Sequence, residues 1–252
     1  AGTVTSRSPV AVARAVAKLG RGVLQALGVV RRLKPAVVVG FGGYPTFPPL
    51  VAARLCGVPT IIHEQNAVLG WANRMLAKGA TRIATGFPDT AGTAAFAGRV
   101  VVTGNPIRPP VVAAAAIPYE PPAPGGRLKL LVFGGSQGAR VFADLVPAAL
   151  AELPADLRAR IDLVQQARPE DMERTRTALA AVGIAAELAP FFTDMPARIA
   201  AAHLVVCRSG ASTVAELAAI GRPAILVPLP HARDQDQAAN AALIARAGGA
   251  FV

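Results

Sequence analysis

Two glycine-rich segments in the second half of the chain have the composition of phosphate-binding loops. Residues 133–139 read FGGSQGA and residues 207–216 read CRSGASTVAE, each after an apolar run. A glycine-rich turn that leads into a helix offers unpaired backbone N–H groups and the positive end of the helix dipole to an anion. The first segment has neither the ending of a P-loop nor the spacing of a dinucleotide fingerprint. Together the two segments predict a site for a diphosphate or a nucleotide sugar.

The second segment also fits simple helix capping. Ser212 and Thr213 are residue types that cap helices, and Glu216 stands one turn inside, as in a capping box. Because two glycine-rich helix starts occur in the same half, we favour the phosphate site, with two helix ends directed at one diphosphate.

Polar side chains also follow apolar runs elsewhere. His63, Glu64, Gln65 and Asn66 are consecutive, residues 40–44 read GFGGY, and residues 231–240 are rich in amides and carboxylates. Closely spaced glycines let a backbone approach a ligand without interference from Cβ. A polar run at the end of a strand is more often functional than structural, although a capped turn is the alternative.

The elements that must position these segments alternate along the chain. Short apolar runs bounded by Gly and Pro are separated by amphipathic segments of helix length, which predicts an α/β fold of parallel strands covered by crossover helices. Ligands of such folds bind at the carboxyl ends of the strands. The predicted strands are 36–40, 59–62, 81–84, 99–103, 128–133, 160–165, 184–188, 204–207 and 223–228.

A proline-rich segment divides the chain. Residues 109–126 hold six prolines in eighteen positions, which favours extended backbone over helix or central strand. The charge changes near the same place, since residues 1–119 hold 13 basic residues and two acids, whereas residues 120–252 hold 13 of each. We therefore expect domains at 1–108 and 127–252, joined by a linker at 109–126.

The formal charge of +11 raises nucleic acid and anionic membrane as partners. Segment 9–33 has a single apolar stripe at helical spacing, with cations opposite it and no acid. The stripe comprises Val12, Val16, Leu19, Val23, Leu27 and Val30, and the cations are Arg14, Lys18, Arg21 and Arg32. The segment is either a crossover helix packed on the sheet or a helix whose cations also face anionic lipid.

Composition excludes several other classes of protein. A hydrophobic content of 53% is too high for a disordered chain. Cys56 and Cys207 have apolar neighbours, so neither a disulfide framework nor a metal site is indicated. The longest uncharged run, 35–53, contains three Gly and four Pro, which argues against a transmembrane helix. Because the chain starts without Met at AGTVTSRSPV, we expect it to be a fragment.

Read in order, the motifs resemble those of the MurG family of N-acetylglucosaminyltransferases, which act in peptidoglycan synthesis. They cover residues 36–252 and are GFGGYPTFP, HEQNAVLGWANRMLA, GNPIR, FGGSQGAR, FFTDM, CRSGASTVAELAAIGRPAILVPLPHA and DQAANA. The resemblance implies the GT-B architecture, with two Rossmann-like doubly wound domains and a cleft between them. The N-terminal domain would take the acceptor and the C-terminal domain the donor.

The resemblance also implies the reaction. N-acetylglucosamine would pass from UDP-N-acetylglucosamine to the 4-hydroxyl of undecaprenyl-pyrophosphoryl-N-acetylmuramoyl-pentapeptide, with inversion. The enzyme would be peripheral, on the cytoplasmic face of the bacterial inner membrane, with roles in cell wall biogenesis, cell shape and cell division. No cofactor or metal would be required, because backbone donors and Arg108 can stabilise the departing UDP.

Matching the family's motifs residue by residue implies the contacts. Asn66 and Gln237 would touch the N-acetylglucosamine, Arg108 and Ser136 would lie near the nucleotide and diphosphate, and Phe192 would lie near the uracil. Phosphate and ribose would be held by Ala211, Ser212, Thr213, Val214, Ala215 and Glu216, with Glu216 on the ribose. The acceptor cleft would include Gly42, Gly43 and Tyr44.

The chain departs from the family pattern in its first 35 residues. Family members open with a GGTGGH loop whose His is the usual candidate for the general base, and residues 1–35 contain no such loop. The chain would therefore begin inside the acceptor domain, stop before the closing C-terminal helices and be inactive alone. His63 and Glu64 are weak substitutes for the base, and we favour a structural role for both.

Two alternatives remain. One is another GT-B enzyme that uses a UDP-sugar, such as a glycolipid transferase or an epimerase. The other is a basic nucleic-acid-binding protein, which we disfavour because the aromatic residues of 1–119 are scattered without the spacing of a binding module.

Overall fold

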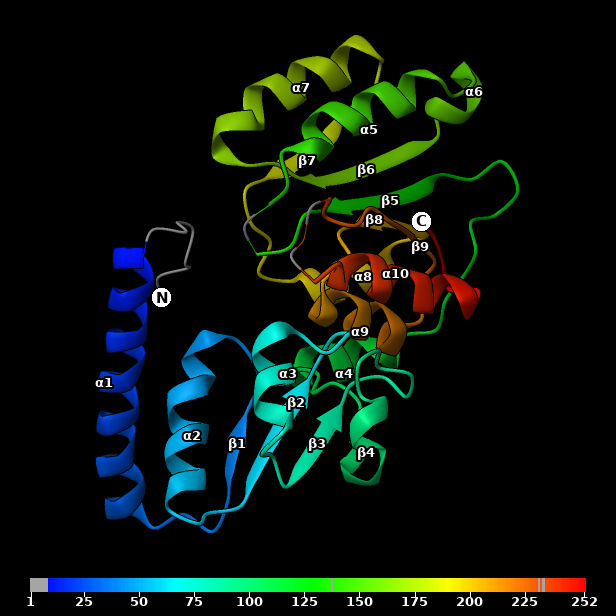
Figure 1. Ribbon diagram of the computed structural model, residues 1–252. Coiled ribbons are helices and arrows are strands. Elements are labelled where there is room, and N and C mark those ends of the chain that lie inside the picture. The colour runs from blue at the N-terminus through cyan, green and yellow to red at the C-terminus, as the bar shows by residue number, and fades with distance from the viewer. Residues whose placement is uncertain (1–8, 137, 231, 233) are drawn as a thin grey trace. The chain divides into compact units, whose positions relative to one another are not determined.

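The computed structural model describes residues 9–136, 138–230, 232 and 234–252, and the side chains of 14, 15 and of 17 onward within its first helix (Figure 1). The contacts divide the chain into two compact units, Ala1–Asn105 and Pro106–Val252. We call them unit 1 and unit 2 and describe each by itself. In the described part of the chain, no helix is both long and apolar enough to cross a bilayer.

Unit 1 is built on a four-stranded parallel sheet with the strand order β1-β2-β3-β4. Its core lies between this sheet and the helices α2 and α3, where Leu50, Ile62 and Ile83 are buried. The elements are α1 (Pro9–Leu33), β1 (Val38–Gly40), η1 (Tyr44–Thr46), α2 (Phe47–Leu55), β2 (Thr60–Glu64), α3 (Trp71–Ala77), β3 (Arg82–Thr85), η2 (Ala94–Arg99) and β4 (Val100–Val102).

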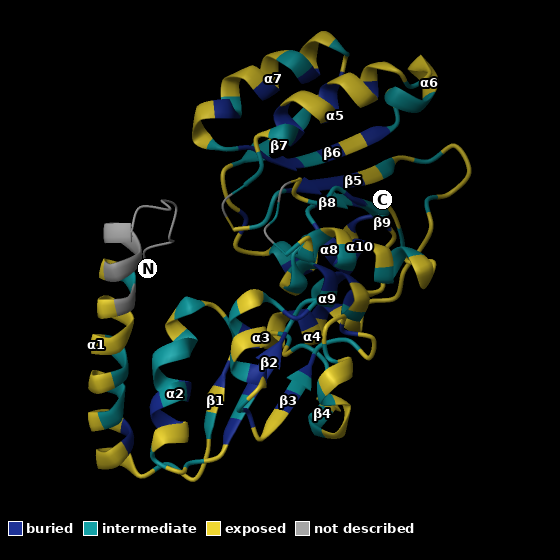
Figure 2. Cartoon of the chain, in the orientation of Figure 1, coloured by how far each residue is buried: buried dark blue, intermediate teal, exposed yellow. Residues whose placement is uncertain are grey.

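The first helix, α1, has the predicted bounds and packs against α2 rather than directly on the sheet (Figure 1). Val30 is buried and Val23 and Leu27 are half-buried, so this part of the predicted stripe faces α2 (Figure 2). Leu19 is 37% exposed, so it does not belong to the packed stripe. Val12 and Val16 lie outside the described side chains. The predicted cations of α1 that are described are all exposed.

Unit 2 is built on a six-stranded parallel sheet with the strand order β10-β9-β8-β5-β6-β7. The elements are α4 (Pro109–Ala115), β5 (Leu128–Phe133), α5 (Val141–Ala151), α6 (Ala155–Arg158), β6 (Ile161–Gln166), η3 (Pro169–Asp171), α7 (Met172–Ala181), β7 (Ala186–Ala189), α8 (Met195–Ala201), β8 (Leu204–Cys207), α9 (Ala211–Ile220), β9 (Ala224–Leu226), α10 (Asp236–Arg246) and β10 (Ala250–Phe251).

The strand order of unit 2 reverses between β5 and β8. From β5 the chain moves outward to β6 and β7, and then returns to the other side of β5 as β8. Helices α5 and α7 pack together on one face of the sheet, and α8, α9 and α10 cover the other (Figure 1). In a doubly wound sheet the point where the order reverses leaves a crevice outside the carboxyl ends of the two strands, and ligands bind there.

The structure confirms the predicted strands as elements and corrects some of their bounds. β2 runs to Glu64, two residues beyond the prediction, so His63 and Glu64 belong to the strand and are buried. The two-residue strand β10 was not predicted.

The prediction of extended backbone through 109–126 is wrong for its first seven residues, which form α4. Pro109 and Pro110 occupy the first helical positions, where a missing N–H costs nothing. The chain after α4 is held by the buried guanidinium of Arg222, which donates to Ile117 O at 2.9 Å and to Pro118 O at 3.2 Å. These contacts fix the segment within unit 2.

Candidate functional site

The carboxylate of Glu64 organises the end of β2. Its Oε1 accepts hydrogen bonds from the backbone N–H and the Nδ2 of Asn66, at 3.1 and 3.0 Å. Its Oε2 accepts from Gly70 N at 2.9 Å and from Asn73 Nδ2 at 2.8 Å. Gly70 is the N-cap of α3, so the buried carboxylate joins β2, the HEQN turn and the start of α3.

The ring of His63 is also held by hydrogen bonds within unit 1, one at each nitrogen. Gln65 Nε2 donates to His63 Nδ1 at 3.0 Å, and His63 Nε2 lies 3.0 Å from Gly104 O. Since a carbonyl oxygen can only accept, Nε2 carries the proton and the ring is the neutral tautomer. Both ring nitrogens of His63 and both oxygens of Glu64 are therefore engaged by the protein, which supports the structural role that we favoured for them.

The GFGGY loop lies beside this polar cluster. Gly42 and Gly43 have φ angles of 81° and 74°, in the left-handed region that favours glycine. A Cβ at Gly42 would lie 3.3 Å from Asn73 Nδ2 and 3.8 Å from Gln65 Oε1. Tyr44 begins the turn η1. The structure thus brings the predicted acceptor residues of the loop to the same edge of unit 1 as HEQN.

The glycine-rich loop after β5 is a tight turn whose shape requires glycine. Gly134 N donates to Gln166 Oε1 at 2.9 Å, and a Cβ at Gly134 would lie 2.2 Å from the backbone nitrogen of Ala139. Gly135 and Gly138 have φ angles of 88° and 66°. Ser136 is exposed in this turn, next to Gln137, which lies outside the described residues.

Helix α9 begins with no side-chain cap. Its N-cap is Gly210, so Ser212 and Thr213 lie inside the helix and make no cap hydrogen bond. The capping interpretation is therefore wrong. Glu216 binds Arg108 instead, accepting from its Nε at 3.1 Å and its Nη2 at 2.9 Å. The remaining predicted residues of this helix, Ala211, Val214 and Ala215, occupy its first two turns.

A second set of hydrogen bonds ties α10 to the loop before α9. Ser209 is buried and donates from Oγ to Gln237 O at 2.8 Å, while Asn240 Nδ2 donates to Ser209 O at 3.0 Å. Gln237 Oε1 accepts from Leu229 N at 3.0 Å. The predicted donor residue Gln237 is thereby fixed against the carboxyl ends of β8 and β9.

Phe192, the predicted neighbour of the uracil, is covered by other residues of unit 2. Its ring is buried, and the guanidinium of Arg198 lies 4.2 Å from its centroid, so this face of the ring is covered by protein. Arg198 is also paired with Glu187 and Asp194, and these hydrogen bonds raise the pKa of its guanidinium.

Burial shifts the pKa of two side chains that lie shortly before α9 in the chain, Cys207 and Arg208. It raises the pKa of the Cys207 thiol, and it lowers the pKa of the Arg208 guanidinium. Arg208 Nη1 donates to Val227 O and Pro228 O at 3.0 and 2.8 Å, so this cation holds the loop after β9. Within the described residues, no group of three His, Cys, Asp or Glu side chains is arranged to hold a metal ion.

Sequence reasoning did not single out the residues that shape these loops. Asn73, Gln166 and Ser209 are buried, and each makes a hydrogen bond that fixes a loop. A polar residue inside or directly after an apolar run, such as the Gln165-Gln166 pair that ends β6, could have indicated these buried loop contacts.

Comparison with known proteins identifies both units. The glycosyltransferase family 28 N-terminal domain matches residues 2–85, and the glycosyltransferase family 28 C-terminal domain matches residues 129–252. A relative from Methylobacterium sp. (strain 4-46) is 62% identical over 251 residues, covering 99% of this chain and 68% of the relative. It is named UDP-N-acetylglucosamine–N-acetylmuramyl-(pentapeptide) pyrophosphoryl-undecaprenol N-acetylglucosamine transferase, as is a relative from Rhodopseudomonas palustris that is 57% identical.

Solved structures agree. The crystal structure of MurG from Acinetobacter baumannii is 34% identical and matches with a TM-score of 0.75, covering 93% of this chain and 65% of that chain. The UDP-GlcNAc 2-epimerase from Neisseria meningitidis matches with a TM-score of 0.66, covering 93% of this chain and 68% of that chain, but is only 12% identical, so it shows the fold alone. The fold is thus α/β with two Rossmann-like units, as in GT-B enzymes.

The chain spans about two thirds of the length of these proteins, 68% of the Methylobacterium relative and 65% of the crystallised MurG chain. Both family 28 domains match, and the relatives at 57–62% identity carry one name. The chain therefore belongs to glycosyltransferase family 28 and, within it, to the MurG family of N-acetylglucosaminyltransferases.

Proposed function

We propose that unit 2 binds UDP-N-acetylglucosamine and that the protein transfers its N-acetylglucosamine to the 4-hydroxyl of undecaprenyl-pyrophosphoryl-N-acetylmuramoyl-pentapeptide, with inversion. The observation that carries the proposal is the reversal of strand order between β5 and β8. Phe133 and Cys207, the last residues of these strands, are register partners. Both glycine-rich loops therefore leave the sheet side by side, at the place where doubly wound folds bind nucleotides.

The diphosphate of the donor is the group that these loops suit. The N-terminus of α9 has no side-chain cap, so its first backbone N–H groups and the helix dipole are available to an anion. Ser136 adds an exposed hydroxyl from the loop after β5. In this proposal Ala211, Ser212 and Thr213 hold phosphate through their backbone and hydroxyl groups.

The ion pair between Arg108 and Glu216 has a role in the same proposal. Arg108 is 61% exposed, whereas Glu216 is 14% exposed, so the carboxylate is the fixed partner and the guanidinium the movable one. We assign Glu216 to the ribose hydroxyls and Arg108 to the negative charge that develops on the departing UDP. Gln237 contacts the sugar, and Phe192 lies at the edge of the uracil site. Asn66 in unit 1 remains a predicted contact of the sugar, and Gly42, Gly43 and Tyr44 remain predicted acceptor residues.

Isothermal calorimetry with UDP tests the donor site without requiring turnover. We expect Ser136→Ala and Glu216→Ala each to weaken UDP binding by about tenfold, since each removes one or two hydrogen bonds to the ligand. Glu173→Ala is the matched control, because Glu173 is an 85% exposed carboxylate on α7. Absence of UDP binding by the unmodified chain, or equal losses in Glu173→Ala, would refute the donor site.

The cation-rich helix α1 supports a peripheral position on an anionic membrane, on the cytoplasmic face where UDP-sugars occur. Arg14, Lys18 and Arg21 are exposed, and the same helix exposes Leu24 and Leu33 at 69% and 66%. Apolar and cationic side chains on one exposed helix suit the interface of a bilayer with anionic headgroups. This position would serve peptidoglycan synthesis, and through it cell shape and division.

Sedimentation with vesicles tests the membrane proposal. Changing Arg14, Lys18 and Arg21 together to Gln should reduce binding to vesicles that contain phosphatidylglycerol, because each cation near such a surface contributes about 1 kcal/mol. The control is a second triple variant, in which three exposed cations of unit 2 are changed to Gln: Lys129, Arg176 and Arg246. It has the same net charge as the α1 variant. Equal binding by the two triple variants would remove α1 from the membrane surface.

A further inference from the structure

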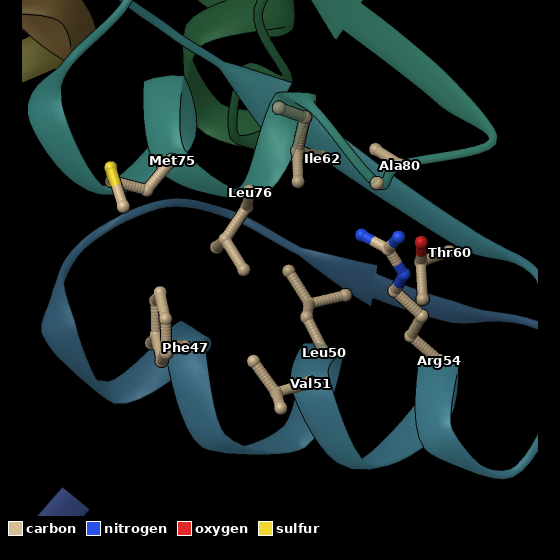
Figure 3. Close-up of a pocket in the computed structure, with 10 residues that line it drawn as sticks. Phe47, Leu50, Val51, Arg54, Thr60, Ile62, Met75, Leu76 and Ala80 are labelled. Carbon is tan, nitrogen blue, oxygen red and sulfur yellow. The ribbon is translucent and has the colours of Figure 1, made fainter.

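Unit 1 contains a cavity that none of the proposed donor or acceptor residues lines. Its volume is about 170 Å³, and it lies between α2, α3 and β2 (Figure 3). The lining residues are Phe47, Leu50, Val51, Arg54, Thr60, Ile62, Met75, Leu76, Gly79 and Ala80. All of them belong to unit 1.

The cavity lies away from the polar cluster of His63 and Glu64. Thr60 begins β2 and Glu64 ends it, and four steps along a parallel strand span about 13 Å. The cavity also reaches Gly79 and Ala80, which precede β3, so its charged end lies near the amino ends of the strands. The predicted acceptor residues lie at the opposite, carboxyl ends.

Most of the lining residues are apolar, and those deepest in unit 1 are fully shielded from solvent. Ile62 is fully buried and Leu50 is 3% exposed, while Met75 on α3 is 47% exposed and borders the opening. Figure 3 shows Phe47, Leu50 and Val51 from α2 facing Met75 and Leu76 from α3. A cavity of about 150 Å³ with similar walls admits benzene, so this one has room for an apolar segment of about six carbons.

Arg54 is the charged residue of the lining, and the fold makes room for its guanidinium. A Cβ on Gly79 would lie 1.7 Å from Arg54 Nη1, so the guanidinium of this exposed arginine lies directly against Gly79. The guanidinium of Arg54 makes no hydrogen bond or ion pair to any described residue. Unit 1 has two acids, of which Glu64 is buried with four donors around it. Arg54, which lies in the last turn of α2, therefore gives one end of the cavity a positive charge that no described acid pairs with.

We propose that this cavity binds a single-chain amphiphile with an anionic head, such as an alkyl phosphate, with about six carbons between α2 and α3 and the head on Arg54. The volume limits the occupant to one short chain, because two acyl chains would not fit. A guanidinium next to an apolar wall suits a phosphate better than a neutral head, since the hydrogen bonds to phosphate are charge-assisted and bidentate. The ligand is a monomer in solution, and the site is separate from the transfer reaction.

Methionine methyl NMR observes the cavity directly. The chain has three methionines, Met75 in the cavity and Met172 and Met195 in unit 2. With ¹³C-methyl methionine, octyl phosphate added below its micellar concentration should shift the Met75 resonance in a saturable manner and leave the other two unchanged. Octyl glucoside, with the same tail and a neutral head, should bind at least tenfold more weakly, and inorganic phosphate should cause no shift.

The length of the alkyl chain tests the volume. Each buried methylene is worth about 0.8 kcal/mol, or about fourfold in affinity. Hexyl phosphate should therefore bind about fifteenfold more tightly than butyl phosphate, and octyl phosphate should add little because the cavity is full. A steady rise from butyl to octyl would indicate partition onto an open surface and would overturn the proposal.

Two variants distinguish binding of the ligand's anionic head from binding of its alkyl chain. Arg54→Gln should lower the affinity for octyl phosphate to that for octyl glucoside, whereas Arg82→Gln, which removes an exposed cation of β3, should not. Val51→Phe should fill the cavity and abolish the Met75 shift for both ligands, with Trp71 fluorescence as the check that unit 1 is folded. No shift of Met75, equal shifts of all three methionines, or undiminished binding by Arg54→Gln would each refute the site.

Discussion

Replacing Glu64 by Gln should destabilise unit 1 strongly. The carboxylate receives four hydrogen bonds, two at each oxygen, and is 2% exposed. Glutamine keeps one oxygen and puts an NH₂ group where the other was, so two buried donors lose their acceptor and face another donor. Hydrogen bonds to charged groups contribute about 1.5–3 kcal/mol each, so the free energy of unfolding should fall by about 3–6 kcal/mol.

Urea unfolding followed by tryptophan fluorescence measures this loss. Trp71 is the single tryptophan of the chain and directly follows Gly70, whose N–H donates to Glu64, so its signal reports unit 1. Asp89→Asn is the matched control, because Asp89 is the other acid of unit 1 and is exposed. This control changes the net charge equally and should alter stability by less than about 0.5 kcal/mol. A similar small effect in both variants would mean that the buried network does not stabilise the fold.

Two further predictions concern unit 2. Gly134→Ala should lower thermal stability by several degrees, because a Cβ there meets the backbone of its own loop at 2.2 Å. Gly210→Ala should cost far less, because nothing lies within 4 Å of a Cβ there and the loss is limited to that of a glycine N-cap. Differential scanning calorimetry compares the two, and equal losses would contradict the loop geometry. Burial raises the pKa of the Cys207 thiol, so this thiol should stay protonated and unreactive toward a disulfide reagent at pH 8, whereas the half-buried Cys56 should react first. Labelling of both cysteines at one rate in the folded protein would show that β8 is open to solvent.

The sequence predicts the sheet of unit 2 well because its strands are covered on both faces by helices. A strand between two layers of helices is continuously apolar, and such runs as 128–133 and 204–207 match β5 and β8 residue for residue. The same rule placed the end of β2 too early, since His63 and Glu64 are polar. Their partners lie on α3 and on the chain around Gly104, so the burial of both residues depends on contacts that local sequence does not reveal.

The start of α9 was harder to predict for a related reason. Ser212, Thr213 and Glu216 have the types and spacing of a capped helix, and local propensity alone favours that arrangement. In the structure the helix starts earlier, at Ala211 after Gly210, and Glu216 is paired with Arg108, which lies 108 positions earlier in the chain. A long-range ion pair of this kind cannot be read from spacing within one helix.

The two units differ in whether the polar groups at the ends of their strands are hydrogen-bonded by the protein itself. In unit 1 the polar groups at the end of β2 are satisfied by the protein itself, with Glu64 and His63 fully engaged. In unit 2 the helix after β8 starts on a glycine without a side-chain cap, beside a loop whose glycines keep side chains away from the backbone. Residues 120–252 carry equal numbers of acids and bases, so in our proposal the attraction of a diphosphate to unit 2 comes from oriented backbone N–H groups rather than from net charge. If both proposals hold, binding of UDP should weaken with salt much less than binding to anionic vesicles, since we assign vesicle binding to the exposed cations of α1.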